Sequence, residues 1–135
     1  MAATGGPGDV NRAQVAARGE SLARRHLEGI GFRIEAHNWR SRQGEIDLVA
    51  EDGETIVFVE VKARTGRQFG RPEESITRAK RRHLLEAALA YLEEHDLPNA
   101  AWRIDVIAID LAPSGAPLRL DHYPDAVHAG EDGRP

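Results

Sequence analysis

The sequence contains no cysteine among its 135 residues. This absence excludes disulfide bonds, thiolate zinc sites and thiol nucleophiles, and it is consistent with a reducing cytoplasm. No apolar run approaches the roughly 18 residues that a membrane-spanning helix needs. The first ten residues also lack the charged and apolar regions of a signal peptide. We therefore expect a cytoplasmic protein with no membrane partner.

Two further motif classes are missing. The six histidines show neither HxxxH nor HxH spacing, which argues against a zinc site or a histidine-based catalytic triad. No glycine-rich P-loop is present, so we expect no nucleotide cofactor. The chain also has no internal repeat, and its length suits one domain with its own core.

The apolar patterning predicts an α/β domain over about residues 10–125, with residues 1–9 and 126–135 as disordered tails. A capping box formed by Asn11 and Gln14 begins a helix that ends near Gly29. The remaining elements are predicted as strands over 32–38, 45–50, 55–63, 102–111 and 118–123, a basic connection over 39–44, a loop over 65–72 and a helix over 73–94. The order αβββαβ(β) favours a mixed β-sheet flanked by helices.

Charged residues interrupt the most apolar predicted strand. Residues 55–63 read TIVFVEVKA, so one carboxylate, Glu60, and one ammonium group, Lys62, stand in an otherwise apolar run. Isolated charges in such a strand are costly unless they are paired, lie at a cleft or bind a metal. Because side chains alternate along a strand, Glu60 and Lys62 project from the same face, with Cα atoms about 7 Å apart.

The preceding strand carries two more acids on one face, Glu45 and Asp47. Asp52 and Gly53 suit the centre of a tight hairpin turn between the two strands. This turn would place Glu45 opposite Glu60, and Asp47 diagonally from Glu60 on the same face.

Three acids and one lysine are therefore expected near one end of the hairpin. Carboxylates this close repel or share protons unless a cation joins them. Oxygen ligands favour Mg²⁺ or Mn²⁺ over zinc, and such an ion can activate water and neutralise a phosphate. The alternative is a cross-strand ion pair on a solvated face, with Glu45 paired to a nearby arginine.

The motif GEIDLVA at 44–50, followed by FVEVKAR at 58–64, resembles the PD-(D/E)xK nuclease signature. More closely, it resembles the YraN-like family (uncharacterised protein family 0102), predicted endonucleases similar to archaeal Holliday-junction resolvases. The likeness covers about residues 12–110. Its other motifs are Gly19-Glu20 with Ala23, Asn38-Trp39-Arg40, Phe69-Gly70, Lys80 with Leu84, and Arg103-Ile104-Asp105-Val106. The resemblance implies a restriction-endonuclease-like core of three layers.

The resemblance also implies a catalytic set. Asp47 and Glu60 would be metal ligands for Mg²⁺ or Mn²⁺, Lys62 the catalytic lysine, and Glu20 an additional catalytic acid and metal ligand delivered from the first helix. Ile46 stands where the literal superfamily motif has proline, a departure that this family itself makes. The alternative for Glu20 is a solvated surface position.

The distribution of charge bears on the partner. The whole chain has a net charge of −4, which at face value argues against nucleic-acid binding. The segment 62–82, however, holds eight basic residues and only two acidic ones. Arg40, Arg42, Arg64 and Lys80 are the expected phosphate contacts, which would position DNA without reading its sequence.

Together these features predict a metal-dependent DNA endonuclease that hydrolyses phosphodiester bonds. Branched or otherwise structured DNA is the expected substrate, with a role in DNA repair or recombination, and the resemblance adds a possible homodimer. Two alternatives stay open: a non-catalytic nucleic-acid-binding module of the same fold, and a protein-interaction scaffold.

Overall fold

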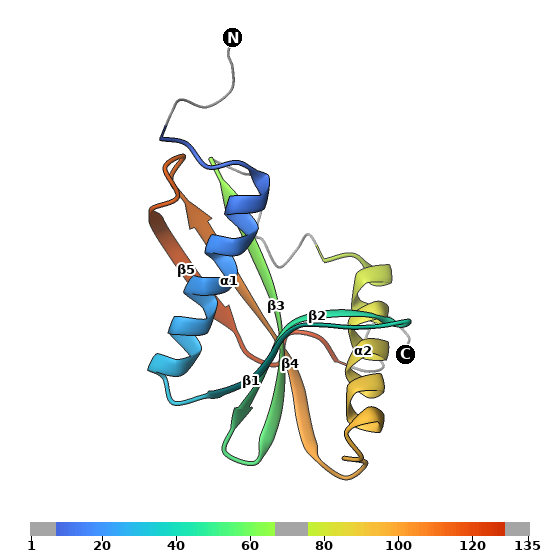
Figure 1. Cartoon of the computed structure of the whole chain (residues 1–135). Coiled ribbons are helices and arrows are strands. Elements are labelled where there is room, and N and C mark those ends of the chain that lie inside the picture. The colour runs from blue at the N-terminus through green and yellow to red at the C-terminus, as the bar shows by residue number, and fades with distance from the viewer. Residues whose placement is uncertain (1–7, 67–75, 129–135) are drawn as a thin grey trace.

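The computed structural model describes residues 8–66 and 76–128, and its element order is αβββαββ, as predicted (Figure 1). The predicted loop at 65–72 lies outside the described residues from position 67 onwards, as does the Phe69-Gly70 motif. The elements are α1 (Arg12–Gly29), β1 (Arg33–Ser41), β2 (Gly44–Asp52), β3 (Thr55–Thr65), α2 (Arg78–Glu94), β4 (Ala101–Leu111) and β5 (Pro117–Tyr123).

The five strands form one mixed sheet in the order β1-β2-β3-β4-β5. Only β3 and β4 are parallel, because helix α2 makes the crossover between them. The two helices lie on opposite sides of the sheet (Figure 1), α1 over a core that includes Leu48 and Val59, and α2 over a core that includes Val49 and Phe58. The α/β fold with a three-layer core, predicted from the sequence, is confirmed.

Both helices begin at capped residues. The Asn11 side chain accepts from the Gln14 N–H and the Gln14 side chain accepts from the Asn11 N–H, each at 2.8 Å, which is the predicted capping box. Helix α2 begins after Thr77, whose hydroxyl oxygen accepts from the Lys80 N–H at 3.1 Å. The helix was predicted from residue 73, which lies outside the described residues, and the prediction is wrong for residues 76 and 77: Thr77 has an extended backbone and caps the helix, so α2 begins at Arg78. Neither of the described helices combines the length and apolarity needed to cross a membrane.

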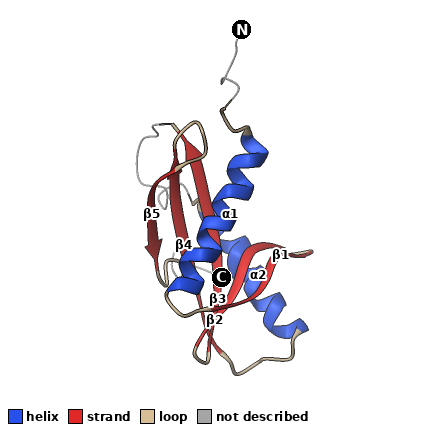
Figure 2. Ribbon diagram, turned by 60° about the vertical axis from the view of Figure 1, so that its left-hand side comes forward, coloured by secondary structure: helices blue, strands red, loops and turns tan. Residues whose placement is uncertain are grey.

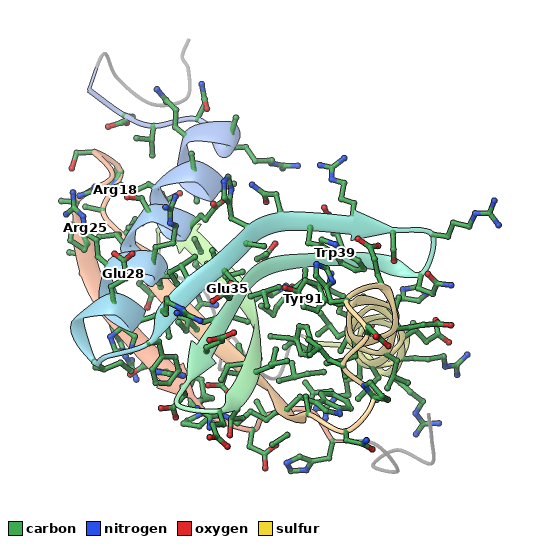
Figure 3. All side chains as sticks on the ribbon, turned by 60° about the horizontal axis from the view of Figure 1, so that its bottom comes forward. Arg18, Arg25, Glu28, Glu35, Trp39 and Tyr91 are labelled. Atoms are coloured by element: carbon green, nitrogen blue, oxygen red, sulfur yellow. The ribbon has the colours of Figure 1, made fainter. Side chains whose placement is uncertain are left out.

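Strand β1 is longer than predicted. It continues through Trp39 to Ser41, so the basic connection expected over 39–44 shrinks to a turn at Arg42 and Gln43. The Trp39 ring packs edge-on against the Tyr91 ring of α2, with centroids 5.3 Å apart (Figure 3). This buried contact gives the end of β1 an apolar anchor on α2, which the sequence pattern of alternating residues did not reveal.

The hairpin of β1 and β2 curves away from β3, β4 and β5 (Figure 2). Along β2, Leu48 packs in the core under α1, whereas Ile46 packs in the core under α2. In β1, Asn38 lies between the residues that pair with Leu48 and Ile46, and its φ of 51° is left-handed. Asparagine tolerates this conformation better than most residues, so Asn38 marks the bend of the hairpin.

The ordered domain extends beyond β5. The Ala126 N–H donates to the Ile104 carbonyl at 2.7 Å, and Val127 is buried against the core under α2. These two residues, which the sequence pattern assigned to the C-terminal tail, therefore contribute to the fold.

Candidate active site

The sheet divides at one point, which we call the fork. The pairing of β2 with β3 ends at Leu48 and Val59, while β3 continues beside β4 from Glu60 to Thr65. Within the described residues, no strand pairs with β3 on its β2 side beyond Val59. The next residues on the two diverging strands are Asp47 and Glu60, so both acids lie at the fork.

The hairpin register differs from the sequence prediction by two residues. Asp52 pairs with Thr55, so Gly53 and Glu54 form the turn rather than Asp52 and Gly53. Gly53 has a φ of 64° at the first turn position, a conformation that favours glycine. The predicted diagonal placement of Asp47 is wrong: the observed register brings Asp47 beside Glu60.

Asp47 is held by the backbone of the neighbouring strand. The Val61 N–H donates to Asp47 Oδ2 at 2.8 Å. Had β2 continued along β3, this N–H would have donated to the backbone of β2 instead. Burial raises the pKa of Asp47, and this hydrogen bond opposes the rise only in part. The carboxyl group is therefore both fixed in place and costly to ionise.

Glu60 is more deeply buried, with 6% of its surface exposed. Burial, followed by the charge of Asp47, raises the pKa of Glu60 to about 7. A hydrogen bond joins the two carboxyl groups, donated by Glu60. Near neutral pH the pair therefore holds about one proton, which a cation could replace.

Two lysines accompany the acid pair. Lys80, in the first turn of α2, places Nζ 3.6 Å from Glu60 Oε2. Lys62 lies two residues beyond Glu60 on the same face of β3, and its charge also lowers the pKa of Glu60, by less than Lys80 does. Lys80, which the sequence analysis predicted to contact phosphate, therefore lies beside the acid pair.

Glu20 reaches the other side of the fork from α1. Its carboxylate accepts from the Asn38 side-chain amide at 3.1 Å and lies 3.2 Å from His37 Nδ1. Glu20 and Asp47 both line a cleft of about 430 Å³ between α1 and β3. Glu20 therefore lines the same cleft as Asp47, but its described partners are Asn38 and His37, and its predicted role as a metal ligand stays a prediction.

The other predicted site residues lie farther from the acid pair. Glu45 pairs with Arg40 across the β1–β2 hairpin at 3.2 Å, so the expectation that Glu45 faces Glu60 is wrong. Arg42 is exposed in the turn of that hairpin. Arg64 donates to Asp110 of β4 at 2.8 Å.

The donor set bears on which metal could bind. Over residues 8–66 and 76–128, no group of three or more histidine or acidic side chains is close enough to hold a metal ion. Two carboxylates, Asp47 and Glu60, are close enough to share a proton. Mg²⁺ is commonly bound by one or two carboxylates, with water and substrate phosphate oxygens completing its octahedron. The acid pair fits that pattern.

Sequence reasoning missed two arrangements. Asn38 both bends the hairpin and binds Glu20; its signals in the sequence are the Asn38-Trp39-Arg40 motif and the tolerance of asparagine for a left-handed backbone. The second is a buried network around Asp105 of β4, a residue that the sequence analysis placed in a family motif but to which it gave no role.

In this network the carboxylate of Asp105, which has no exposed surface, accepts from Arg103 Nε at 2.9 Å and interacts with His122 Nε2 at 2.8 Å. It also accepts from the Asp125 N–H, and the other nitrogen of His122 lies 3.0 Å from His26 of α1. Burial alone would raise the pKa of Asp105, but these partners together lower it. The network therefore ties α1, β4 and β5 together around one ionised carboxylate.

The comparisons with known proteins all identify the same protein family. The model of the uncharacterised protein family UPF0102 matches residues 19–109. The UPF0102 protein of Chloroflexus aurantiacus is 49% identical over 115 residues, 84% of this chain and 91% of the relative. Those of Roseiflexus castenholzii and Nocardia farcinica are 46% and 45% identical, over 81% and 78% of this chain and 89% and 83% of the relatives.

Proposed function

Because the chain belongs to the uncharacterised protein family UPF0102, we propose its function from the site itself: a metal-dependent DNA endonuclease centred on the acid pair at the fork. The observation that carries the proposal is the buried pairing of Asp47 with Glu60, with Lys80 3.6 Å from Glu60. Burying two carboxyl groups beside a lysine costs desolvation free energy. Such a cluster suits a site that binds a cation and an anion together.

Asp47 and Glu60 would hold Mg²⁺ or Mn²⁺, with Glu20 as a further acid on the cleft side. When bound, the ion would activate water and neutralise charge on the scissile phosphate. The protein itself would position the reacting groups. The Val61 N–H holds Asp47 in place, and β3 places Glu60 and Lys62 on one face of the strand. Fixed groups of this kind need little reorganisation during the reaction.

The lysines supply positive charge where a phosphodiester gains negative charge. Lys62 would contact the scissile phosphate, and Lys80, next to Glu60, would hold the adjoining phosphate. The first turn of α2 also contains Arg78, which is exposed. Basic groups beside an acid pair allow local binding of DNA by a chain whose net charge is −4.

Burial of the acid pair favours a catalytic site over the two alternatives. A protein-interaction scaffold or a passive DNA-binding module gains nothing from two carboxyl groups that must share a proton at neutral pH. Apolar residues of similar size would make such a fold more stable. The cost therefore supports a chemical role for Asp47 and Glu60.

The partner that this site suits is DNA, with branched or structured forms as the substrate and the cytoplasm as the place of action. A homodimer would give two sites for the two strands of a junction, and the molar mass in solution tests it.

The test is a cleavage panel of a four-way junction, a flap, a single strand and a duplex, each with Mg²⁺, Mn²⁺ or EDTA. We expect cleavage of at least one structured substrate that requires the metal and is lost in Asp47→Asn. Glu45→Gln is the matched control, because Glu45 lies two residues away but faces Arg40. No cleavage of any substrate, or undiminished cleavage by Asp47→Asn, would overturn the proposal.

A further inference from the structure

The fork leaves one edge of β3 open. Since the Val61 N–H points away from β4 and toward Asp47, the N–H of Ala63, two residues on, points the same way. Pairing with β2 has already ended at Val59. The open edge therefore presents backbone polar groups to the cleft between α1 and β3, directly beside Asp47.

The walls of this cleft are small and mostly apolar. Val15, Ala16 and Ala17 line it from α1, and Val61 and Ala63 line it from β3. The cleft narrows beside Gly19, where α1 approaches β3 so closely that an added Cβ would lie 2.4 Å from the Ala63 Cβ. The volume of about 430 Å³ lies in the range of roughly 300–1,000 Å³ that holds a small organic group.

Polar groups stand at the two ends of the cleft. Glu20 and Asn38 lie at the end near Asp47, and Arg12 lies at the other. Arg12 and Glu20 are eight residues apart on α1, hence about 12 Å along the helix axis. A stacked nucleic-acid strand advances roughly 3.4 Å per nucleotide, so the cleft matches a short stretch of one strand.

We propose that this cleft binds an unpaired nucleotide of the strand to be cut, placing its neighbouring phosphate at the acid pair. This inference rests on the proposed endonuclease function and narrows its substrate class to DNA with an unpaired nucleotide at the cleavage point. The cleft is too small for a duplex, so fully paired DNA cannot use it.

The chemistry of the cleft matches that of a nucleobase and its phosphate. A base has apolar faces, which suit the alanine and valine walls, and polar edges, which suit the Asn38 amide and the open edge of β3. Arg12 suits the next phosphate along the strand. The Asn38 amide donates to Glu20 at 3.1 Å, and this hydrogen bond holds the amide in place at the lining of the cleft.

Binding by the metal-free protein tests this inference without relying on activity. The probe is a flap DNA with 2-aminopurine at its first unpaired position, titrated in EDTA against a fully paired duplex of the same sequence. Ala17→Trp fills the cleft from the exposed surface of α1. Ala13→Trp is the matched control, since Ala13 is an exposed alanine one turn earlier that does not line the cleft.

We expect the wild type and Ala13→Trp to bind the flap at least about tenfold more tightly than the duplex, with a change in 2-aminopurine fluorescence. Ala17→Trp should bind both equally while keeping the thermal stability of the wild type. Equal affinities in the wild type, or an intact preference in Ala17→Trp, would overturn the inference. If the wild type shows no flap preference but cleaves a substrate of the panel, this inference fails and the endonuclease proposal stands. If the wild type prefers the flap but cleaves no substrate, the endonuclease proposal fails, and with it the cleavage role of the cleft, although the cleft still binds an unpaired nucleotide.

Discussion

Glu60 donates a hydrogen bond to Asp47 at the fork, and the pKa of Glu60 stands near 7 as a result of burial and of the neighbouring charge. Two acids on neighbouring strands thus behave as one unit that exchanges a proton in the physiological range. The consequences for stability and for metal binding can be measured separately.

The stability of the metal-free protein should fall as the pH rises from about 4.5 to about 7. The folded state keeps a proton on Glu60 in this window, whereas the unfolded state, with the ordinary pKa, has lost it. The free energy of unfolding therefore decreases by up to roughly 3 kcal/mol across the window. Urea unfolding in EDTA at several pH values measures it. Glu60→Gln should lack this component, and an unchanged pH profile in that variant would contradict the assignment.

Mn²⁺ should stabilise the protein at pH 8 but not at pH 5, because the ion competes with the proton held by Asp47 and Glu60. At a concentration one hundred times the dissociation constant, the gain should be about 2.7 kcal/mol. Thermal unfolding with and without Mn²⁺ measures it. Glu60→Gln should lose the gain and Glu45→Gln should keep it. Equal stabilisation of all three proteins would place the ion elsewhere.

The network around Asp105 should be structural. Asp105→Ala removes the buried carboxylate that Arg103 and His122 share and leaves Arg103 only the more exposed Asp52, which we expect to cost on the order of 3 kcal/mol of unfolding free energy. Asp121→Ala is the control, because its ion pair with Arg119 is solvent-exposed and should be worth less than about 1 kcal/mol. Urea unfolding compares them. A loss in Asp105→Ala no larger than the control's would show that the network contributes little.

The close approach of α1 to β3 gives a fourth prediction. Gly19→Ala would place its Cβ 2.4 Å from the Ala63 Cβ, so the helix must move away from the strand, at a cost of about 1–3 kcal/mol. Gly29→Ala, at the end of the same helix, meets nothing within 4 Å and should be neutral or slightly stabilising. Thermal unfolding of the two variants distinguishes packing from helix propensity, and equal effects would contradict the packing explanation.

Much of this structure could be predicted from the sequence. The element order, the capping box at Asn11 and the nearness of Asp47 to Glu60 all follow from local patterns, because period-2 and period-3.6 spacing and turn residues act over a few positions. The family assignment followed from ordered motifs. These features need no knowledge of which element packs against which.

The sequence could not supply the features that depend on tertiary contacts. The hairpin register was wrong by two residues because the glycine with positive φ took the first turn position, and this shift removed Glu45 from the site. The pairing of Lys80 with Glu60 joins α2 to β3, and the network of Asp105 joins three elements. No local pattern encodes such contacts.

The most direct test of the proposed site is the single-turnover cleavage rate in Mn²⁺ on the best substrate of the panel. We predict that Glu60→Gln is slower than the wild type by about a thousandfold, equivalent to about 4 kcal/mol of transition-state stabilisation, while Glu45→Gln retains the wild-type rate. A wild-type rate in folded Glu60→Gln would show that the acid pair at the fork is not the catalytic centre.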